Sequence, residues 1–177
     1  MVQLKIYPLD NCVDRVIALE SAQHFKPLIQ FIQESRRILR HDDGLLVFAI
    51  PVITMAKSSL SSKIHNLMRL GILSLTWASE HYELESVKSL ITRSGFEIIN
   101  IQHIGSHVYE PLADYYAQNR EIIKSILLKE RTYSLSSYLH GFLYNIIERV
   151  VYNSALKMKE ASQKGFIDYV LIKAKLV

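Results

Sequence analysis

The sequence has a single cysteine and no long apolar run. With Cys12 alone, the chain cannot form an internal disulfide, which suits a reducing compartment. No segment reaches the roughly 18 consecutive apolar residues of a membrane-spanning helix, and residues 1–10 lack an apolar core of signal-peptide length. We therefore expect a cytoplasmic protein without a transmembrane segment.

Patterns typical of metal sites and of nucleic-acid binding are also absent. The seven histidines are scattered without metal-ligand spacing, so we expect no metal. The net charge of +4 is modest, and its densest group, Arg36, Arg37 and Arg40, has helical spacing. No aromatic-basic motif accompanies that group, so we expect no nucleic-acid partner. The three arginines form either a solvated helix face or a patch for a phosphate or an acidic partner.

The sequence does contain enough apolar residues for one packed domain. It has 177 residues, of which 49% are hydrophobic, and ten of them are tyrosines. Short apolar runs bounded by polar residues are typical of buried strands, and apolar residues at helical spacing are typical of amphipathic helices. We predict strands near 13–19, 45–50, 96–104 and 166–175, and helices at 26–40, 58–77, 83–96, 111–130 and 134–162. This order predicts an α/β fold.

Polar residues follow the first predicted strand directly. The run Val16 to Leu19 ends on Glu20 and Ser21, and His24 comes three residues later. In open α/β sheets the ligand crevice lies beyond the carboxyl ends of the strands. These side chains therefore either face a ligand or form the polar cap of the next helix, with Ser21 as the capping residue.

Several segments resemble motifs of class I S-adenosylmethionine-dependent methyltransferases, in the branch that acts on small molecules. "YPLDNCVDRV" (7–16) resembles the family's "LPF-D-N-S-F-D-x-V" approach to its fourth strand, and Glu20, Ser21 and His24 match its "E-S-x-x-H". Three later segments resemble the family's approach to the fifth strand, a helix-to-strand junction and the closing strand: "RILRHDDGL" (37–45), "LITRSGFEIINIQHIG" (90–105) and "GFIDYVLIKAKL" (165–176).

The resemblance implies a partial Rossmann-like class I methyltransferase fold, in a single truncated domain over residues 1–177. It implies a sheet of about four strands with helices on both faces. The last strand would run antiparallel between the second and third predicted strands. Residues 54–82 would form a lid-like helical insertion, and residues 106–163 a helical insertion before the last strand.

The family's amino-terminal cofactor motifs have no counterpart here. None of the six glycines stands in a G-x-G context, and Gln3 and Leu4 stand where the family has an Asp-Ala pair that contacts adenine. The acidic residue that would hold the ribose is missing as well. The chain thus resembles the carboxyl-terminal portion of the family, and we expect it to bind S-adenosylmethionine weakly or not at all by itself. We also expect self-association, or a partner chain carrying the amino-terminal half, with the strand edge at 14–19 in the contact.

By resemblance, Leu19 and Glu20 would flank the methionine part of the cofactor, and His24 would face the acceptor as a catalytic base. Ser21 would lie on the acceptor side, together with residues of the lid-like segment: His65, Trp77, His81 and Tyr82. For the lid residues, ordinary helix packing is an equal alternative.

Two functions follow from these observations. In the first, the chain is the acceptor-side half of an enzyme that transfers a methyl group from S-adenosylmethionine to a small molecule. In the second, it is a non-catalytic methyltransferase remnant or an interaction module that does not bind the cofactor by itself. An apolar lid with tyrosines and histidines favours a small aliphatic or aromatic acceptor.

Overall fold

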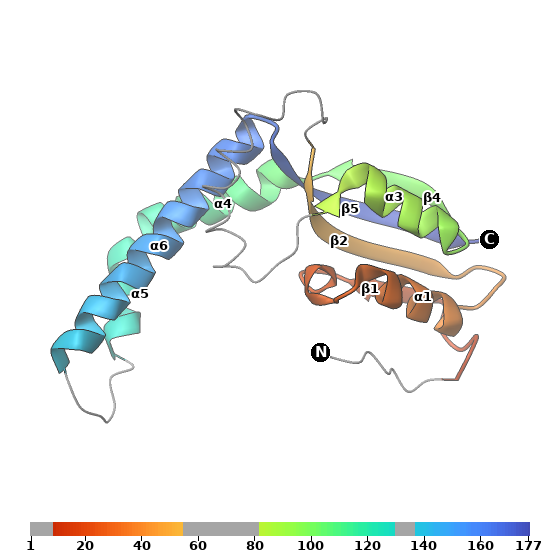
Figure 1. Ribbon diagram of the computed structural model, residues 1–177, viewed down its shortest axis with the longest axis horizontal. Coiled ribbons are helices and arrows are strands. Elements are labelled where there is room, and N and C mark those ends of the chain that lie inside the picture. Colours follow the sequence, from red (N-terminus) through yellow and green to blue (C-terminus); the bar gives the residue numbers. More distant parts are fainter. Residues whose placement is uncertain (1–8, 55–81, 130–136) are drawn as a thin grey trace.

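The computed structural model describes residues 9–54, 82–129 and 137–177. It has an open sheet, two helices against one face of the sheet, and a helical arm that projects beyond one end (Figure 1). Apart from Thr54 and Tyr82, the lid-like insertion predicted at 54–82 lies outside the described residues, as does the helix predicted at 58–77.

The main sheet has the strand order β1-β2-β5-β4. Its strands are β1 (Arg15–Ala18), β2 (Leu45–Ile53), β5 (Ile167–Leu176) and β4 (Phe96–His103). The β1–β2 pair is parallel, and β5 is antiparallel to both β2 and β4. The predicted place of the last strand, antiparallel between the second and third predicted strands, is confirmed.

A fifth strand was not predicted. β3 (Tyr82–Glu83) pairs in parallel with Val52 and Ile53 at the carboxyl end of β2. Two residues are too few to show the alternation by which a strand is recognised in a sequence. The α/β class and the partial methyltransferase-like sheet are nonetheless as expected.

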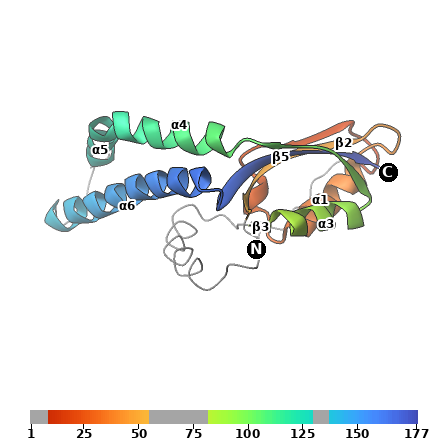
Figure 2. The same cartoon turned by 90° about the horizontal axis from the view of Figure 1, so that it is seen from above.

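Helices α1 (Leu28–Ile38) and α3 (Leu84–Arg93) cover one face of the sheet (Figure 2). Because side chains alternate along a strand, every second residue of β2 and β5 points into the core beneath these helices. That core includes two sets of fully buried side chains: Leu46, Phe48, Ile50 and Ile172 from the sheet, and Leu28, Ile32, Val87 and Ile91 from the helices. Both helices agree with the predicted segments.

The remaining helices form the arm. They are α4 (Gly105–Gln118), α5 (Arg120–Lys129) and α6 (Ser137–Gln163), and they lie between β4 and β5 in the sequence. At the base of the arm, Tyr109 of α4 and Met158 of α6 pack with Ala49 and Tyr169. Ala49 and Tyr169 alternate with core residues of their strands, so the arm contacts the sheet face opposite α1 and α3.

Helix α4 begins six residues earlier than the predicted start at 111. Pro111, the first residue of the predicted helix, lies inside α4. Pro111 is exposed. The carbonyl that its missing N–H leaves unpaired can therefore bond to water, which lowers the cost of an interior proline.

Strand β1 lies at the edge of the main sheet. Ile17 is in register with Val47, on the face away from α1 and α3, and 65% of its surface is exposed; Leu19, just beyond the strand, is 58% exposed. Among the described residues, no helix covers this part of the sheet (Figure 2). β1 is thus an apolar edge whose outward backbone groups have no strand partner in the described chain.

Candidate functional site

The chain leaves β1 through a strained residue. Glu20 has φ 53°, in the left-handed region that L-residues other than asparagine, aspartate and histidine seldom adopt. Such a conformation costs about 1–2 kcal/mol, and residues held in this way concentrate at functional sites. Its side chain is exposed at the carboxyl end of the strand, where open α/β sheets bind ligands.

Three further polar side chains lie near this end of β1: Glu20 acts on Tyr109 and Tyr169, and Gln23 acts on Tyr169. Tyr169 comes from β5, Tyr109 from the first turns of α4, and Gln23 from the short 3-10 helix η1 (Ala22–His24). All three are buried, and the two tyrosine rings meet edge to face with centroids 6.1 Å apart. The hydroxyl of Tyr169 and the Oε1 atom of Gln23 lack a hydrogen-bond partner of normal geometry among the described residues.

Burial and charge keep both tyrosines protonated. Burial is the main cause that raises the pKa of Tyr109, and the carboxylates of Asp168 and Glu20 raise it further. Burial likewise raises the pKa of Tyr169, with Glu20 as the next cause, whereas Gln23 acts in the opposite direction. Both phenols therefore stay neutral at physiological pH, with an O–H donor and free lone pairs.

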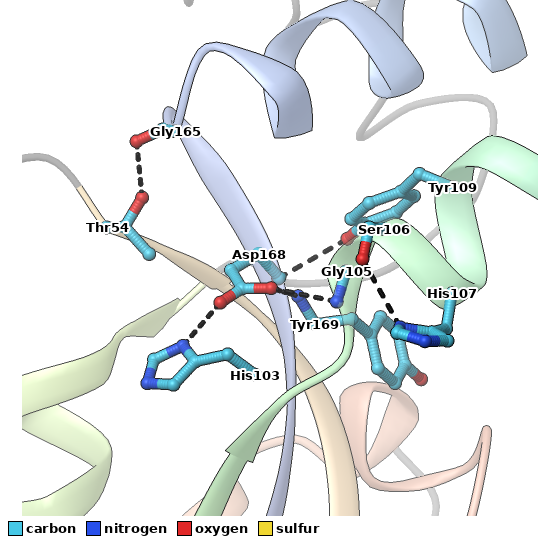
Figure 3. Close-up of polar contacts among 9 residues, drawn as sticks. All are labelled: Thr54, His103, Gly105, Ser106, His107, Tyr109, Gly165, Asp168 and Tyr169. Carbon is cyan, nitrogen blue, oxygen red and sulfur yellow. Dashed lines mark hydrogen bonds and ion pairs between the residues drawn. The ribbon is translucent and has the colours of Figure 1, made fainter.

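Asp168 joins the arm to the sheet at this point (Figure 3). Its Oδ1 atom accepts hydrogen bonds from the backbone N–H of Gly105 at 2.9 Å and of Tyr169 at 2.7 Å. Its Oδ2 atom lies 2.5 Å from Nδ1 of His103, and its backbone carbonyl accepts a bond from the Tyr109 hydroxyl at 3.4 Å. Asp168 thus caps the first N–H of α4 from another element, because α4 has no side-chain cap of its own.

Close packing makes Gly105 necessary in this network. A Cβ atom on Gly105 would lie below 3.0 Å from Oδ1 of Asp168, 3.0 Å from Oγ of Ser162 and 3.1 Å from the backbone nitrogen of Tyr169. Figure 3 shows His103 and the Tyr169 ring on opposite sides of β5. Asp168 therefore holds the start of α4 in place, while Tyr169 points to the other side of the strand.

Four of the predicted site residues lie in or beside the turn that follows β1. Leu19 and Glu20 follow β1, and Ser21 immediately precedes η1 without any side-chain capping bond, so the capping alternative is not realised. His24 is exposed at the end of η1.

The other predicted residues belong to the lid-like segment. Tyr82, in β3, is half-buried and packs against the core beneath α1 and α3. His65, Trp77 and His81 lie outside the described residues.

Sequence reasoning missed four residues of the cluster: Gln23, Tyr109, Asp168 and Tyr169. Asp168 and Tyr169 are polar residues near the start of the closing strand, and this was the one available signal. Nothing in the sequence indicates that α4 and η1 meet Tyr169, because these contacts join segments far apart in the chain.

The arginines at the end of α1 and just beyond it are largely neutralised. Arg37 pairs with Glu34 at 2.6 Å and also with Asp10, and Arg40 pairs with Asp14 at 2.9 Å. Arg36 packs beside Gly95, in a cavity of about 540 Å³ between α1 and α3 that Arg93 also lines. The alternative of a solvated helix face therefore fits Arg37, whereas Arg40 lies beyond the end of α1.

Two expected absences concern metals and membranes. In the described ranges, no three histidine, cysteine or acidic side chains are placed to hold a metal ion. None of the helices in those ranges has the length and apolar character needed to cross a membrane.

Comparison with known proteins identifies the fold. No protein-family model and no curated protein matches the sequence. The chain is similar to the solved structure of cyclopropane synthase MmaA2 from Mycobacterium tuberculosis, at TM-score 0.70 and 16% identity over 94% of this chain and 56% of that one.

Two further structures are similar to the chain. One is phosphoethanolamine N-methyltransferase 2 of Haemonchus contortus, in complex with phosphomonomethylethanolamine and S-adenosylhomocysteine, at TM-score 0.65 and 13% identity over 95% of this chain and 34% of that one. The other is geranyl diphosphate methyltransferase in complex with S-adenosylmethionine, at TM-score 0.63 and 16% identity over 98% of this chain and 55% of that one.

The chain spans from about a third to somewhat over half of the length of these structures. Almost all of the chain is covered in each comparison. The chain therefore has part of the class I S-adenosylmethionine-dependent methyltransferase fold.

Proposed function

We propose that this chain is the acceptor-side half of an S-adenosylmethionine-dependent enzyme that methylates a small molecule. The observation that carries the proposal is the strained Glu20 at the carboxyl end of β1, surrounded by Gln23, Tyr109 and Tyr169. A strained, exposed carboxylate beside buried polar groups is typical of a site rather than of a packing core.

The residues present fit one side of the cofactor. Leu19 and Glu20 directly follow the carboxyl end of β1. The exposed carboxylate of Glu20 would attract the positively charged methionine end of S-adenosylmethionine. The glycine-rich turn and the ribose-binding carboxylate have no counterpart in this chain, so the nucleoside side needs residues from elsewhere. The exposed β1 edge, with Ile17 and Leu19, supports docking of such a half at this edge.

When bound, S-adenosylmethionine supplies an electrophilic methyl group. This chain's contribution is to orient the acceptor, to exclude water from its reacting atom and to receive its proton. His24 is accessible at the end of η1 and can receive that proton. The neutral phenols of Tyr109 and Tyr169 cannot act as bases, so they orient the acceptor instead.

The test compares this chain alone with this chain joined to an amino-terminal half. The reading frame directly upstream is inspected for a glycine-rich strand and turn, and the longer product is prepared where one is present. By calorimetry we expect weak or no binding of S-adenosylmethionine to this chain alone, and clear binding and methyl transfer with the longer product. Low-micromolar binding to this chain alone would contradict the half-site assignment. A longer product that neither binds S-adenosylmethionine nor transfers a methyl group would favour the alternative, a non-catalytic methyltransferase remnant.

A matched pair of variants tests the role of Glu20 in the longer product. Glu20→Gln keeps the side-chain size and removes the charge, and we expect roughly tenfold weaker cofactor binding because one charge-assisted contact is lost. Glu85→Gln changes an exposed carboxylate on α3 and should leave cofactor binding unchanged.

A further inference from the structure

The cavity between α1 and α3 is lined by a cationic side chain from each helix. Its volume of about 540 Å³ is in the range of sites for small molecules. Arg36 lines it from the last turn of α1 and Arg93 from the last turn of α3. The Cζ atom of Arg36 lies 3.0 Å from the position of a Cβ atom on Gly95, so this guanidinium reaches the turn that directly follows α3.

The carboxylates at this end of α1 are bonded to a different arginine. Of the residues that line the cavity, Asp10 alone is acidic, and both Asp10 and nearby Glu34 accept bonds from Arg37. Arg36 and Arg93, in contrast, form no hydrogen bond or ion pair within the described ranges. Two positive charges thus line one cavity without a carboxylate of their own, an arrangement that attracts an anion.

This cavity lies at the end of the sheet away from the arm (Figure 1). The backbone carbonyl of Arg37 accepts a bond from the N–H of Asn11, which precedes β1, and Gly95 directly precedes β4. Because β5 is antiparallel to both β2 and β4, β4 runs in the same direction as β1 and β2. The cavity therefore lies at the amino ends of β1 and β4, whereas Glu20 follows the carboxyl end of β1, and a ligand here is separate from the proposed methyl transfer.

We propose that this cavity binds a small phosphate monoester that carries an apolar group. A guanidinium can donate two parallel hydrogen bonds to phosphate oxygens, and the two charges of a phosphate monoester match Arg36 and Arg93. A carboxylate has one charge and two oxygens, which suffice for only one of these arginines. The half-buried side chains of Ile29 and Leu90 also line the cavity, and they provide contacts for the apolar group.

The experiment measures binding of four small probes to the full chain. Phenyl phosphate, benzoate and benzylammonium share an aromatic ring and differ in the head group, and inorganic phosphate lacks the ring. Nuclear magnetic resonance follows the backbone amides of residues 33–41 and 90–95 at constant ionic strength and about pH 8, where a phosphate monoester carries two charges. We expect phenyl phosphate to bind about fivefold or more tightly than benzoate or inorganic phosphate, and benzylammonium not to bind.

Two variants remove the proposed cations one at a time. Arg36→Gln and Arg93→Gln each keep a polar side chain without its charge, and each should weaken phenyl phosphate binding about tenfold, as expected for loss of a charge-assisted contact. Arg149→Gln removes the same charge from an exposed position on α6 and should leave binding unchanged. The comparison of probes uses the unaltered chain, so it decides the question even where a variant fails to fold.

Absence of phenyl phosphate binding would overturn the proposal, as would shift changes confined to residues outside 33–41 and 90–95. Benzoate, benzylammonium or inorganic phosphate binding as tightly as phenyl phosphate would overturn it too, and so would unchanged binding in both folded variants. Since no S-adenosylmethionine or methyl acceptor is present, the result stands apart from the test of methyl transfer.

Discussion

Replacing Gly105 by alanine tests whether Asp168 anchors the arm to the sheet. The new Cβ atom would lie below 3.0 Å from Oδ1 of Asp168, and the backbone N–H of residue 105 now donates to that same oxygen. The carboxylate must therefore move away from the bond that it accepts. Its position is also held by Tyr169 N–H and by His103, so the movement disturbs the whole network.

The magnitude follows from three contributions. Overpacking costs about 1–3 kcal/mol, and weakening a hydrogen bond to a charged group costs about 1.5–3 kcal/mol. Alanine recovers up to about 1 kcal/mol of helix propensity relative to glycine, and less in a first turn. We expect a net loss of roughly 2–3 kcal/mol, which for a chain of this size lowers the melting temperature by about 4–12 °C.

Gly165→Ala is the matched control. Gly165 has φ +67° but no atom within 4 Å of a Cβ position, so alanine there meets only the left-handed backbone penalty of about 1 kcal/mol. Urea and thermal unfolding measure both variants, and hydrogen exchange at residue 105 reports the lost cap. Equal effects at the two positions, or no change at position 105, would refute the anchoring role of Asp168.

Three other perturbations have defined outcomes. Glu34→Gln should make unfolding less sensitive to acid. The hydrogen bond from Arg37 lowers the pKa of Glu34 below 4.5 in the folded protein, so ionised Glu34 stabilises the fold. That stabilisation is fully present above pH 4.5 and is lost as the pH falls through the pKa of Glu34 in the folded protein. Urea titrations at about pH 6 and about pH 3 measure the free energy of unfolding of both proteins. An equal loss of that free energy in the variant and the unaltered chain would contradict the prediction. Arg120→Lys should speed hydrogen exchange in α5 and α6, because the two-point contact with buried Glu148 is lost, at a cost of about 1–2 kcal/mol. Lys88→Ala, which removes a surface ion pair on α3, is its control. Ile17→Lys should reduce self-association in light scattering across a dilution series, and an unaltered chain that stays monomeric at every concentration would argue against an adhesive β1 edge.

The sequence by itself determined the elements of the sheet layer. Apolar runs such as residues 45–50 and amphipathic segments such as 26–40 carry their own periodicity, so local physics suffices to place strands and helices. α3 ends at Arg93, close to the predicted end of that helix, and Gly95 follows with φ 81°. Resemblance to a family, rather than periodicity, supplied the place of the last strand between two others.

Only the tertiary structure decided how the arm and the site are built. α4 begins at Gly105 because Asp168, 63 residues later, caps it, and no local pattern around Pro111 contains that information. The cluster of Gln23, Tyr109 and Tyr169 likewise comes from three separate elements whose side chains meet only in the folded chain. Contacts between segments distant in sequence depend on packing and register, which a single sequence does not encode locally, and a site assembled from such contacts is visible only once the chain is folded.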